Sequence, residues 1–443
     1  MRLSLAAHSK LAKTPIKIHP PSPLSKLPTS VLLRSLLVST VSSKRFLLSP
    51  SLSILSFLSK ARKGSFLDVD RNPILFGVLK KTFFNQFCVG VSKAQAQADV
   101  QALKDLGFRG VIITYARETT FDHKSGTIHG QGVPDTANSA NEAKGNQFDP
   151  EVEAWRTGTL ETIDLVGEGD MLALKMSGAG ARVIEDFSTG QTPSRQFLDA
   201  VEEICNECKK RSIRVVVDAE SQNFQKGIAQ VTLDLMRTFN RDGIAVVYNT
   251  YQAYLKKTPE RLAEHLAAAS KEGFTLGLKL VRGAYMLSDD RSLIHDTKQN
   301  TDNAYNGIAQ GALKRSIGEF GATPGRPFPS LNLLLASHNR ESVLTANKLH
   351  QQRRAAGLPT VPVSFAQLHG MSDEVSFTLL QEKDESGAKP EVYKCTTWGS
   401  LSECMGYLVR RAKENQDAVL RTLDEYVALK TEARRRARQI FSF

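Results

Sequence analysis

The first 67 residues of this 443-residue chain contain no aspartate and no glutamate, although they hold eleven lysines and arginines. The rest of the chain carries 47 basic and 46 acidic residues, so nearly all of the net charge of +12 lies in this leading segment. A basic, serine-rich leader without acids is typical of mitochondrial import, and a disordered basic tail is the alternative. We therefore predict an N-terminal targeting segment over residues 1–65, with its cleavage point open, and one folded domain over residues 66–443.

Long apolar runs are also missing. Residues 31–58 are apolar enough to include a helix of the mature protein, but Arg34, Lys44, Arg45 and Pro50 interrupt them. No run reaches the roughly 18 apolar residues that a membrane span needs, so we predict no transmembrane helix. Binding to nucleic acid is not expected either, because the chain beyond residue 67 is nearly neutral and its arginines are not interleaved with aromatic residues.

Cysteine is scarce. The five cysteines form an odd set without a disulfide framework, which fits a reducing compartment. Cys205 and Cys208 form one CxxC inside a helical pattern, with no second pair and no histidine at ligand spacing. We therefore interpret them as buried thiols, and we predict no metal site.

Nucleotide-binding fingerprints are absent as well. Residues 177–182 (SGAGAR) hold two glycines after an apolar run but lack the third glycine of the dinucleotide-binding turn, and no Walker phosphate loop occurs. A bound dinucleotide would have to lie across strand ends. Groups such as Lys279, Arg282 and the backbone of Gly283 and Ala284 would hold it, because glycine permits close approach to phosphate.

From about residue 95 onward, the chain alternates short apolar runs with longer amphipathic stretches, which indicates a parallel sheet with helical crossovers. Eight such units predict an α/β fold with a closed (β/α)8 TIM-like barrel, and an open doubly wound sheet is the alternative. Residues 120–150 are polar and aperiodic and predict a long mobile insertion, whereas residues 415–440 predict a last helix. The candidate strands are 110–116, 171–177, 213–218, 244–249, 275–281, 331–337, 361–367 and 391–395.

Polar residues close nearly every candidate strand, where a barrel builds its active site. For any one of them, a structural polar residue satisfied by the backbone is as good an interpretation, but their repetition around the barrel favours function. They are Glu118, Lys175, Asp218, Gln252, Arg282, Ser337, His338, Asn339 and Gln367.

After the eighth strand, Tyr407, Arg410, Arg411 and Glu414 have the spacing of one helical face. Two arginines on one face repel each other unless an anion balances them, and guanidinium forks match a carboxylate. On the residues alone, a surface ion-pair network on a solvated helix is slightly favoured, and a carboxylate-binding site is the other interpretation.

Four motifs, at residues 279–286 (KLVRGAYM), 337–339 (SHN), 365–371 (FAQLHGM) and 407–415 (YLVRRAKEN), resemble the proline dehydrogenase family, particularly its eukaryotic mitochondrial members. The resemblance spans residues 70–430. It implies a distorted barrel with additional N- and C-terminal helices that binds FAD and oxidises L-proline to 1-pyrroline-5-carboxylate. It also implies electron transfer to a membrane quinone and peripheral association with the matrix side of the inner mitochondrial membrane.

The resemblance further implies roles for individual residues. Asp218, Lys279 and Lys175 would be catalytic. The residues expected to contact substrate are Lys175, Tyr407, Arg410, Arg411, Leu368, Cys395 and Glu118. Those expected to bind the cofactor are Ala219, Gln252, Lys279, Arg282, Gly283, Ala284, Ser337, His338 and Asn339.

Cys395 departs from the family pattern, which generally has a tyrosine there, packed against the proline ring. The smaller side chain leaves space, and loss of an aromatic wall weakens proline binding by roughly 1 to 3 kcal/mol if nothing fills the gap. A dehydrogenase of hydroxyproline or another substituted proline is therefore the nearest alternative. A Schiff-base lyase that uses Lys175 and a non-catalytic binding protein are the others.

Overall fold

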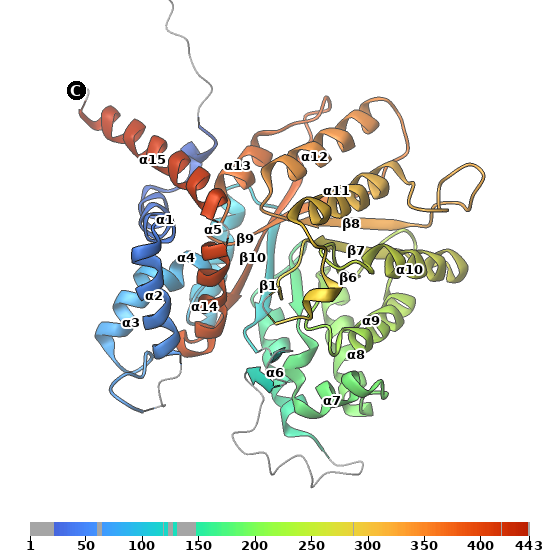
Figure 1. Cartoon of the computed structure of the whole chain (residues 1–443), viewed down its shortest axis with the longest axis horizontal. Helices are drawn as coiled ribbons and strands as arrows, with labels where there is room; N and C mark the ends of the chain where they lie inside the picture. Colours follow the sequence, from blue (N-terminus) through green and yellow to red (C-terminus); the bar gives the residue numbers. More distant parts are fainter. Residues whose placement is uncertain are drawn as a thin grey trace, which may run out of the picture.

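The computed structural model describes residues 22–59, 64–117, 119–122, 127–130, 148–286, 288–417 and 419–441. Eight parallel strands close into a barrel in the order β1-β10-β9-β8-β7-β6-β5-β4. Figure 1 shows helices around its outside and a separate group of helices to one side. The barrel strands are β1 (Gly110–Tyr115), β4 (Met171–Leu174), β5 (Arg214–Val217), β6 (Val247–Gln252), β7 (Leu276–Val281), β8 (Leu331–Ala336), β9 (Val363–Leu368) and β10 (Glu391–Trp398).

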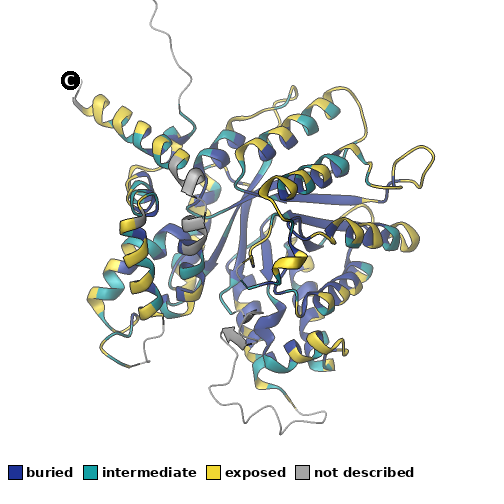
Figure 2. Cartoon of the chain, viewed as in Figure 1, coloured by how far each residue is buried: buried dark blue, intermediate teal, exposed yellow. Residues whose placement is uncertain are grey.

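The helices between the strands cover the barrel, and Figure 2 shows buried strands inside helices whose outer faces are exposed. They are α5 (Lys93–Asp105), α6 (Pro150–Ile163), α7 (Ala181–Thr189), α8 (Arg195–Lys210), α9 (Gln225–Phe239), α10 (Thr258–Glu272), α11 (Lys298–Lys314), α12 (Arg340–Ala355), α13 (Asp373–Gln381) and α14 (Leu401–Asp417). Short helical turns η3 (Met176–Ala179) and η4 (Arg291–Leu293) follow β4 and β7.

All eight predicted strands and the predicted barrel are confirmed. The largest shift is in the fourth strand, which begins at Val247 instead of residue 244. Asn240 causes the delay, because its side-chain oxygen accepts hydrogen bonds from the amides of Val246 and Val247. Its amide group donates to the carbonyls of Val247 and Thr275, so the chain turns before it enters the sheet.

A layer of helices stands beside the barrel (Figure 1). It comprises η1 (Pro23–Lys26), α1 (Thr29–Ser42), α2 (Arg45–Leu58), α3 (Pro73–Leu79), η2 (Lys80–Phe84), α4 (Asn85–Phe87) and the terminal helix α15 (Val419–Phe441). Helix α1 packs on α15, and α2 packs on α14. The described part of the predicted targeting segment is thus helical and in contact with the rest of the fold, while its targeting role remains a prediction.

Most of the predicted insertion, including residues 131–147, lies outside the described residues. Its described parts include two short strands, β2 (Thr119–Asp122) and β3 (Thr127–Gly130), which pair antiparallel. Helix α6 begins where the Asp149 side chain accepts hydrogen bonds from the amides of Glu151 and Val152. Among the described residues, no helix combines the length and apolarity that crossing a bilayer demands. Cys205 and Cys208 are buried thiols in α8, as interpreted from the sequence.

Candidate active site

One carboxylate joins two lysines at the carboxyl ends of three strands. Asp218 follows β5, and its Oδ1 lies 2.7 Å from the Nζ of Lys279 in β7. Its Oδ2 lies 2.9 Å from the Nζ of Lys175, which follows β4. The backbone of Lys175 is fixed in turn, because its carbonyl accepts a 3.0 Å hydrogen bond from the indole of Trp155. The three residues predicted to be catalytic are therefore in direct contact.

The electrostatics of this contact keep Asp218 ionised. Burial alone would raise the pKa of its carboxyl, but the ammonium groups of Lys175 and Lys279 outweigh burial and hold the pKa well below its usual range. An ammonium that is paired with a carboxylate is not a free amine. This pairing of Lys175 therefore favours a charge-positioning role over the nucleophilic role that a Schiff-base lyase would need.

Arg282, one residue past β7, is held on three sides. Its Nε donates to Oδ1 of Asp302 at 2.8 Å, and its two terminal nitrogens donate to the hydroxyls of Ser337 at 2.7 Å and Ser342 at 2.9 Å. The guanidinium carbon lies 4.3 Å from the ring centroid of Tyr305. These contacts fix a planar cation at the end of the barrel where the carboxyl ends of the strands meet, which we call the mouth. A planar guanidinium there suits binding of a phosphate.

The next two residues offer exposed backbone. Gly283 has φ +149°, and a Cβ built there would lie 2.4 Å from the ring of Tyr254. Tyr254 is itself fixed by a 2.9 Å hydrogen bond from its hydroxyl to Asp289. Only glycine fits this position, and it leaves the main chain of Gly283 and Ala284 open to solvent.

Gln252 ends β6 with a buried side chain. Its Nε2 has no hydrogen-bond partner among the described residues. A buried amide without a partner costs about 1–3 kcal/mol, so a carbonyl or ring nitrogen of a bound group would satisfy it. The flavin ring offers such acceptors. The residues at this end of the barrel thus fit a flavin cofactor. Ala219, another predicted cofactor residue, follows Asp218 in the sequence and is buried.

Three further predicted cofactor residues follow β8. Ser337 accepts the hydrogen bond from Arg282, and His338 accepts one at Nε2 from the amide of Leu368 at 3.1 Å. Asn339 has a structural task, because its side chain caps α12 by accepting from the amide of Ser342. Contact of these residues with a cofactor remains a prediction.

Helix α14 presents the predicted carboxylate clamp. Arg411 is only 8% exposed, and its guanidinium carbon lies 4.7 Å from the ring centroid of Tyr407 one turn earlier. Arg410 is partly buried. Tyr407 and Arg411 therefore share one face of α14, as predicted. Helix α14 packs on β10. The side chain of Glu414 lies outside the described residues.

Cys395 in β10 lies within electrostatic reach of both the Asp218–lysine contact and Arg411 of α14. Burial raises the pKa of its thiol to about 11, and the charges of Lys279, Asp218 and Arg411 also act on it. All of these charged groups therefore lie within electrostatic reach of one small side chain. Leu368 pairs with Cys395 across β9 and β10, so both predicted substrate contacts lie at this edge. The remaining predicted contact, Glu118, lies outside the described residues.

Sequence reasoning missed the residues that support the site. Asp302, Ser342 and Tyr305 hold Arg282, although they lie on later helices with no spacing signal that links them to it. Glu220 was also missed. It is fully buried, and its Oε1 accepts a 3.1 Å hydrogen bond from the amide of Ser177 in the turn after Lys175. An acid two residues beyond Asp218, shortly after the apolar run of the third strand, was the available signal.

A cavity of about 260 Å³ lies at the opposite end of the barrel. Two of its arginines are paired: Arg354 lies 2.8 Å from Asp384, and Arg214 lies 3.8 Å from Glu391. The amino ends of barrel strands serve stability rather than chemistry in βα barrels. We therefore do not assign the active site to this cavity.

The fold and the ring of charged strand ends define a βα-barrel enzyme. The family model described as proline dehydrogenase matches residues 96–422, about three quarters of the chain. The chain belongs to the proline dehydrogenase family and is an oxidoreductase of a generally flavin-dependent group.

The curated relatives include proteins named proline dehydrogenase and proteins named hydroxyproline dehydrogenase. The probable mitochondrial proline dehydrogenase of Schizosaccharomyces pombe is 29% identical over 443 residues, which cover 91% of this chain and 88% of that protein. The hydroxyproline dehydrogenase of Homo sapiens is 34% identical over 247 residues, 55% of this chain and 51% of that protein.

Among solved structures, proline utilization A from Bdellovibrio bacteriovorus, inactivated by N-propargylglycine, matches with a TM-score of 0.61 at 16% identity. The match covers 90% of this chain and 39% of that one, so this chain corresponds to about two fifths of the larger protein. At this identity the likeness concerns the fold.

Proposed function

We propose that this protein is an FAD-dependent dehydrogenase that oxidises L-proline to 1-pyrroline-5-carboxylate. The observation that carries the proposal is the contact of Lys175, Asp218 and Lys279 at the barrel mouth, with Arg411 within electrostatic reach. Among the described residues of this cluster, the cations Lys175, Lys279 and Arg411 outnumber the single carboxylate of Asp218, which suits a substrate with a carboxylate. Arg410 and Arg411 would bind that carboxylate, with Tyr407 and Leu368 beside the ring.

The chain's own residues would prepare the substrate for oxidation. Cations near the ring nitrogen disfavour its protonated form, and the imine product requires a neutral amine. FAD, if bound, would supply the two-electron acceptor for this oxidation. Lys279, Arg282, Gln252, Ser337, His338 and the backbone of Gly283 and Ala284 would hold the cofactor. The protein thereby supplies orientation and charge complementarity.

An absorption spectrum of the purified protein, before and after anaerobic addition of L-proline, tests this proposal. We expect flavin bands that bleach when proline is added. Colourless protein that cannot be reconstituted with FAD would instead support a non-catalytic binding role.

A hydroxyproline dehydrogenase is the second candidate, and Cys395 favours it. Its small thiol stands among the charged groups of the mouth, where the family generally has tyrosine, and leaves room for a ring substituent. Steady-state kinetics with proline and 4-hydroxyproline decide between the candidates. In the Cys395→Tyr variant, we expect kcat/KM for proline relative to hydroxyproline to rise about 10-fold or more, because the restored ring packs against proline and excludes the hydroxyl.

We also propose that the protein is mitochondrial and meets the matrix side of the inner membrane, where a quinone takes the electrons. Of fifteen exposed large apolar side chains in the described part of the chain, eight lie between Leu33 and Val78. Phe46 and Phe57, 73% and 63% exposed, stand three turns apart on α2, and residues 22–67 contain no acid. Such a face suits an anionic lipid surface.

Sedimentation with vesicles of phosphatidylcholine, with and without an anionic lipid, tests the membrane contact. We expect binding to the anionic vesicles that the double variant Phe46→Ser, Phe57→Ser lowers severalfold. Phe148→Ser is the matched control, because Phe148 is 65% exposed but lies outside this layer. Equal binding by all three proteins would count against this face.

A further inference from the structure

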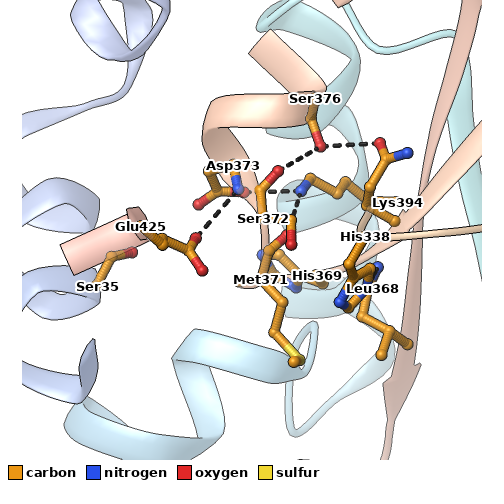
Figure 3. Close-up of polar contacts among 12 residues, drawn as sticks. Ser35, His338, Leu368, His369, Met371, Ser372, Asp373, Ser376, Lys394 and Glu425 are labelled. Carbon is orange, nitrogen blue, oxygen red and sulfur yellow. Dashed lines mark hydrogen bonds and ion pairs between the residues drawn. The ribbon is translucent and has the colours of Figure 1, made fainter. Parts of the chain in front are cut away.

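A short segment, residues 368–372, joins β9 to α13, and we call it the strap. One end of the strap touches the barrel mouth, where the amide of Leu368 donates to Nε2 of His338. In its middle, the Gly370 carbonyl accepts a 2.8 Å hydrogen bond from Gln86, which also bonds Ser35 of α1. The strap therefore lies between the mouth and the terminal helices (Figure 3).

A buried ion pair holds the far end of the strap. Nζ of Lys394 in β10 lies 2.7 Å from Oδ1 of Asp373, and it donates to the Met371 carbonyl at 3.1 Å. The side chains of Lys394 and Asp373 are only 1% and 6% exposed. The ring centroid of Phe108 lies 5.6 Å from the same ammonium, on a third side. The strap is therefore fixed to the barrel wall by a cation that solvent does not reach.

The terminal helix α15 adds a second carboxylate to this pair. Glu425 accepts a 3.1 Å hydrogen bond at Oε1 from the amide of Asp373. Burial and the adjacent Asp373 carboxylate raise the pKa of Glu425 to about 7, although Lys394 opposes the shift. A second carboxylate thus lies beside the Asp373–Lys394 pair where α15 meets the strap (Figure 3).

The other charged groups around this contact are few among the described residues. Arg34 of α1 acts electrostatically on Asp373. His369, in the strap, has its pKa lowered to about 4 by burial first and then by Lys394, so it is neutral at physiological pH. Glu425 is therefore the group of this cluster whose charge changes near neutral pH.

A second path leads from the strap to the mouth. Ser376 of α13 donates to Oε1 of Gln367 at 2.9 Å, and Gln367 donates to the Ser337 carbonyl at 3.2 Å. The hydroxyl of Ser337 in turn accepts from Arg282. Displacement of the strap and the start of α13 would thus reach both His338 and Arg282.

We propose that Asp373, Lys394 and Glu425 are positioning residues that set the strap, and with it His338 and Ser337, against the cofactor. The docking of α15 onto the strap then controls how tightly the protein retains FAD. This inference rests on the proposed function, because it assumes that His338, Ser337 and Arg282 contact the flavin or its phosphates.

The direction of the pH dependence follows from the raised pKa of Glu425. The folded protein holds a proton on Glu425 between about pH 4.5, its ordinary value, and about pH 7. The docking of α15 is therefore strongest below this window and weakens as pH rises through it, because the two carboxylates then repel each other. Retention of FAD should weaken in the same direction.

The test is a titration of full-length protein with FAD at pH 6 and pH 8, followed by flavin fluorescence, with hydrogen exchange of α15 measured in parallel. We expect the FAD Kd of the wild type to rise about tenfold from pH 6 to pH 8, with faster opening of α15. Glu425→Gln keeps the acceptor for the Asp373 amide but stays neutral. It should hold the pH 6 affinity at both pH values.

Asp424→Asn is the matched control, because Asp424 is its exposed neighbour on the same helix, and it should behave like the wild type. A merely structural Glu425 would change the unfolding temperature without changing the pH profile of the FAD Kd. The inference is overturned if wild type shows no change in Kd between the two pH values, or if Glu425→Gln shows the same change as wild type. Wild-type protein that binds no FAD at either pH overturns the proposed function as well.

Discussion

The two ends of the barrel differ in how their charges are balanced. At the carboxyl end, Lys175 and Lys279 share the carboxylate of Asp218, and all three side chains are 17% exposed or less. At the amino end, Arg354 lies 2.8 Å from Asp384, while Arg109 and Arg214 share Glu391 at 3.5 and 3.8 Å; these arginines are 37% to 50% exposed. A cavity of about 260 Å³ lies at the amino end, and Arg214, Arg354 and their acids line it. Burial of the shared charges, rather than the presence of a cavity, distinguishes the carboxyl end, where an anionic ligand is expected.

The largest effect should follow the loss of the shared carboxylate. We expect Asp218→Asn to lower the free energy of unfolding at pH 7 by about 3–5 kcal/mol, because two buried lysines then lose the carboxylate that they share. The depressed pKa of Asp218 gives stability that is present above its ordinary value of 3.8 and is lost as pH falls through the folded value.

Urea denaturation of wild type and Asp218→Asn, at pH 7 and at successively lower pH below 5, measures both parts of this prediction. The difference between the two proteins should shrink as pH falls. A constant difference at every pH would show that the ionised carboxylate is not what joins the lysines.

The next largest effect concerns the clamp on α14. We expect Arg411→Met to lower kcat/KM for proline about 10²- to 10³-fold, because loss of a buried partner of a charged group costs about 2–5 kcal/mol. Methionine keeps apolar contact with Tyr407, so folding should be retained. Arg411→Lys, which keeps the charge but not the planar fork, should fall between the two.

Steady-state kinetics with thermal denaturation as a folding check would measure this effect. Near-normal kcat/KM in a folded Arg411→Met protein would mean that Arg411 does not bind the substrate carboxylate. The difference between the charges of the two barrel ends would then not indicate where the substrate binds.

A smaller effect is expected at Gln252. Because its Nε2 has no partner among the described residues, Gln252→Leu should raise the unfolding free energy of the cofactor-free protein, by up to about 1–3 kcal/mol. The same change should weaken FAD binding about tenfold, through loss of one buried hydrogen bond. Asn347→Leu, at the amino-end cavity, is the matched control and should leave the FAD Kd unchanged in a fluorescence titration. Equal effects of both variants would sink the assignment of Gln252.

The barrel could be predicted from the sequence because each strand is a short buried apolar run, and only the Asn240 turn displaced one of them. The rule that strand ends converge singled out Asp218 and Lys175, but their contact with each other and the contact of Asp218 with Lys279 were not predicted. The partners of Arg282 could not be predicted, since Ser342 lies 60 residues away and has an ordinary helical context. Glu425 is a similar case, because its bond to Asp373 depends on where a terminal helix docks, which no local pattern encodes.

The smallest effect, and the one that most directly tests the contrast, is expected at the amino end. Arg354 is half exposed in its 2.8 Å pair with Asp384, and exposed pairs of this kind contribute about 0–1 kcal/mol. Arg354→Met should therefore lower the unfolding free energy by less than about 1 kcal/mol, with kcat/KM and the FAD Kd unchanged. Denaturation and kinetics on the same preparation measure all three. A turnover loss comparable to that of Arg411→Met would show that the amino-end cavity takes part in function, and that compensated charge does not by itself identify a purely structural end.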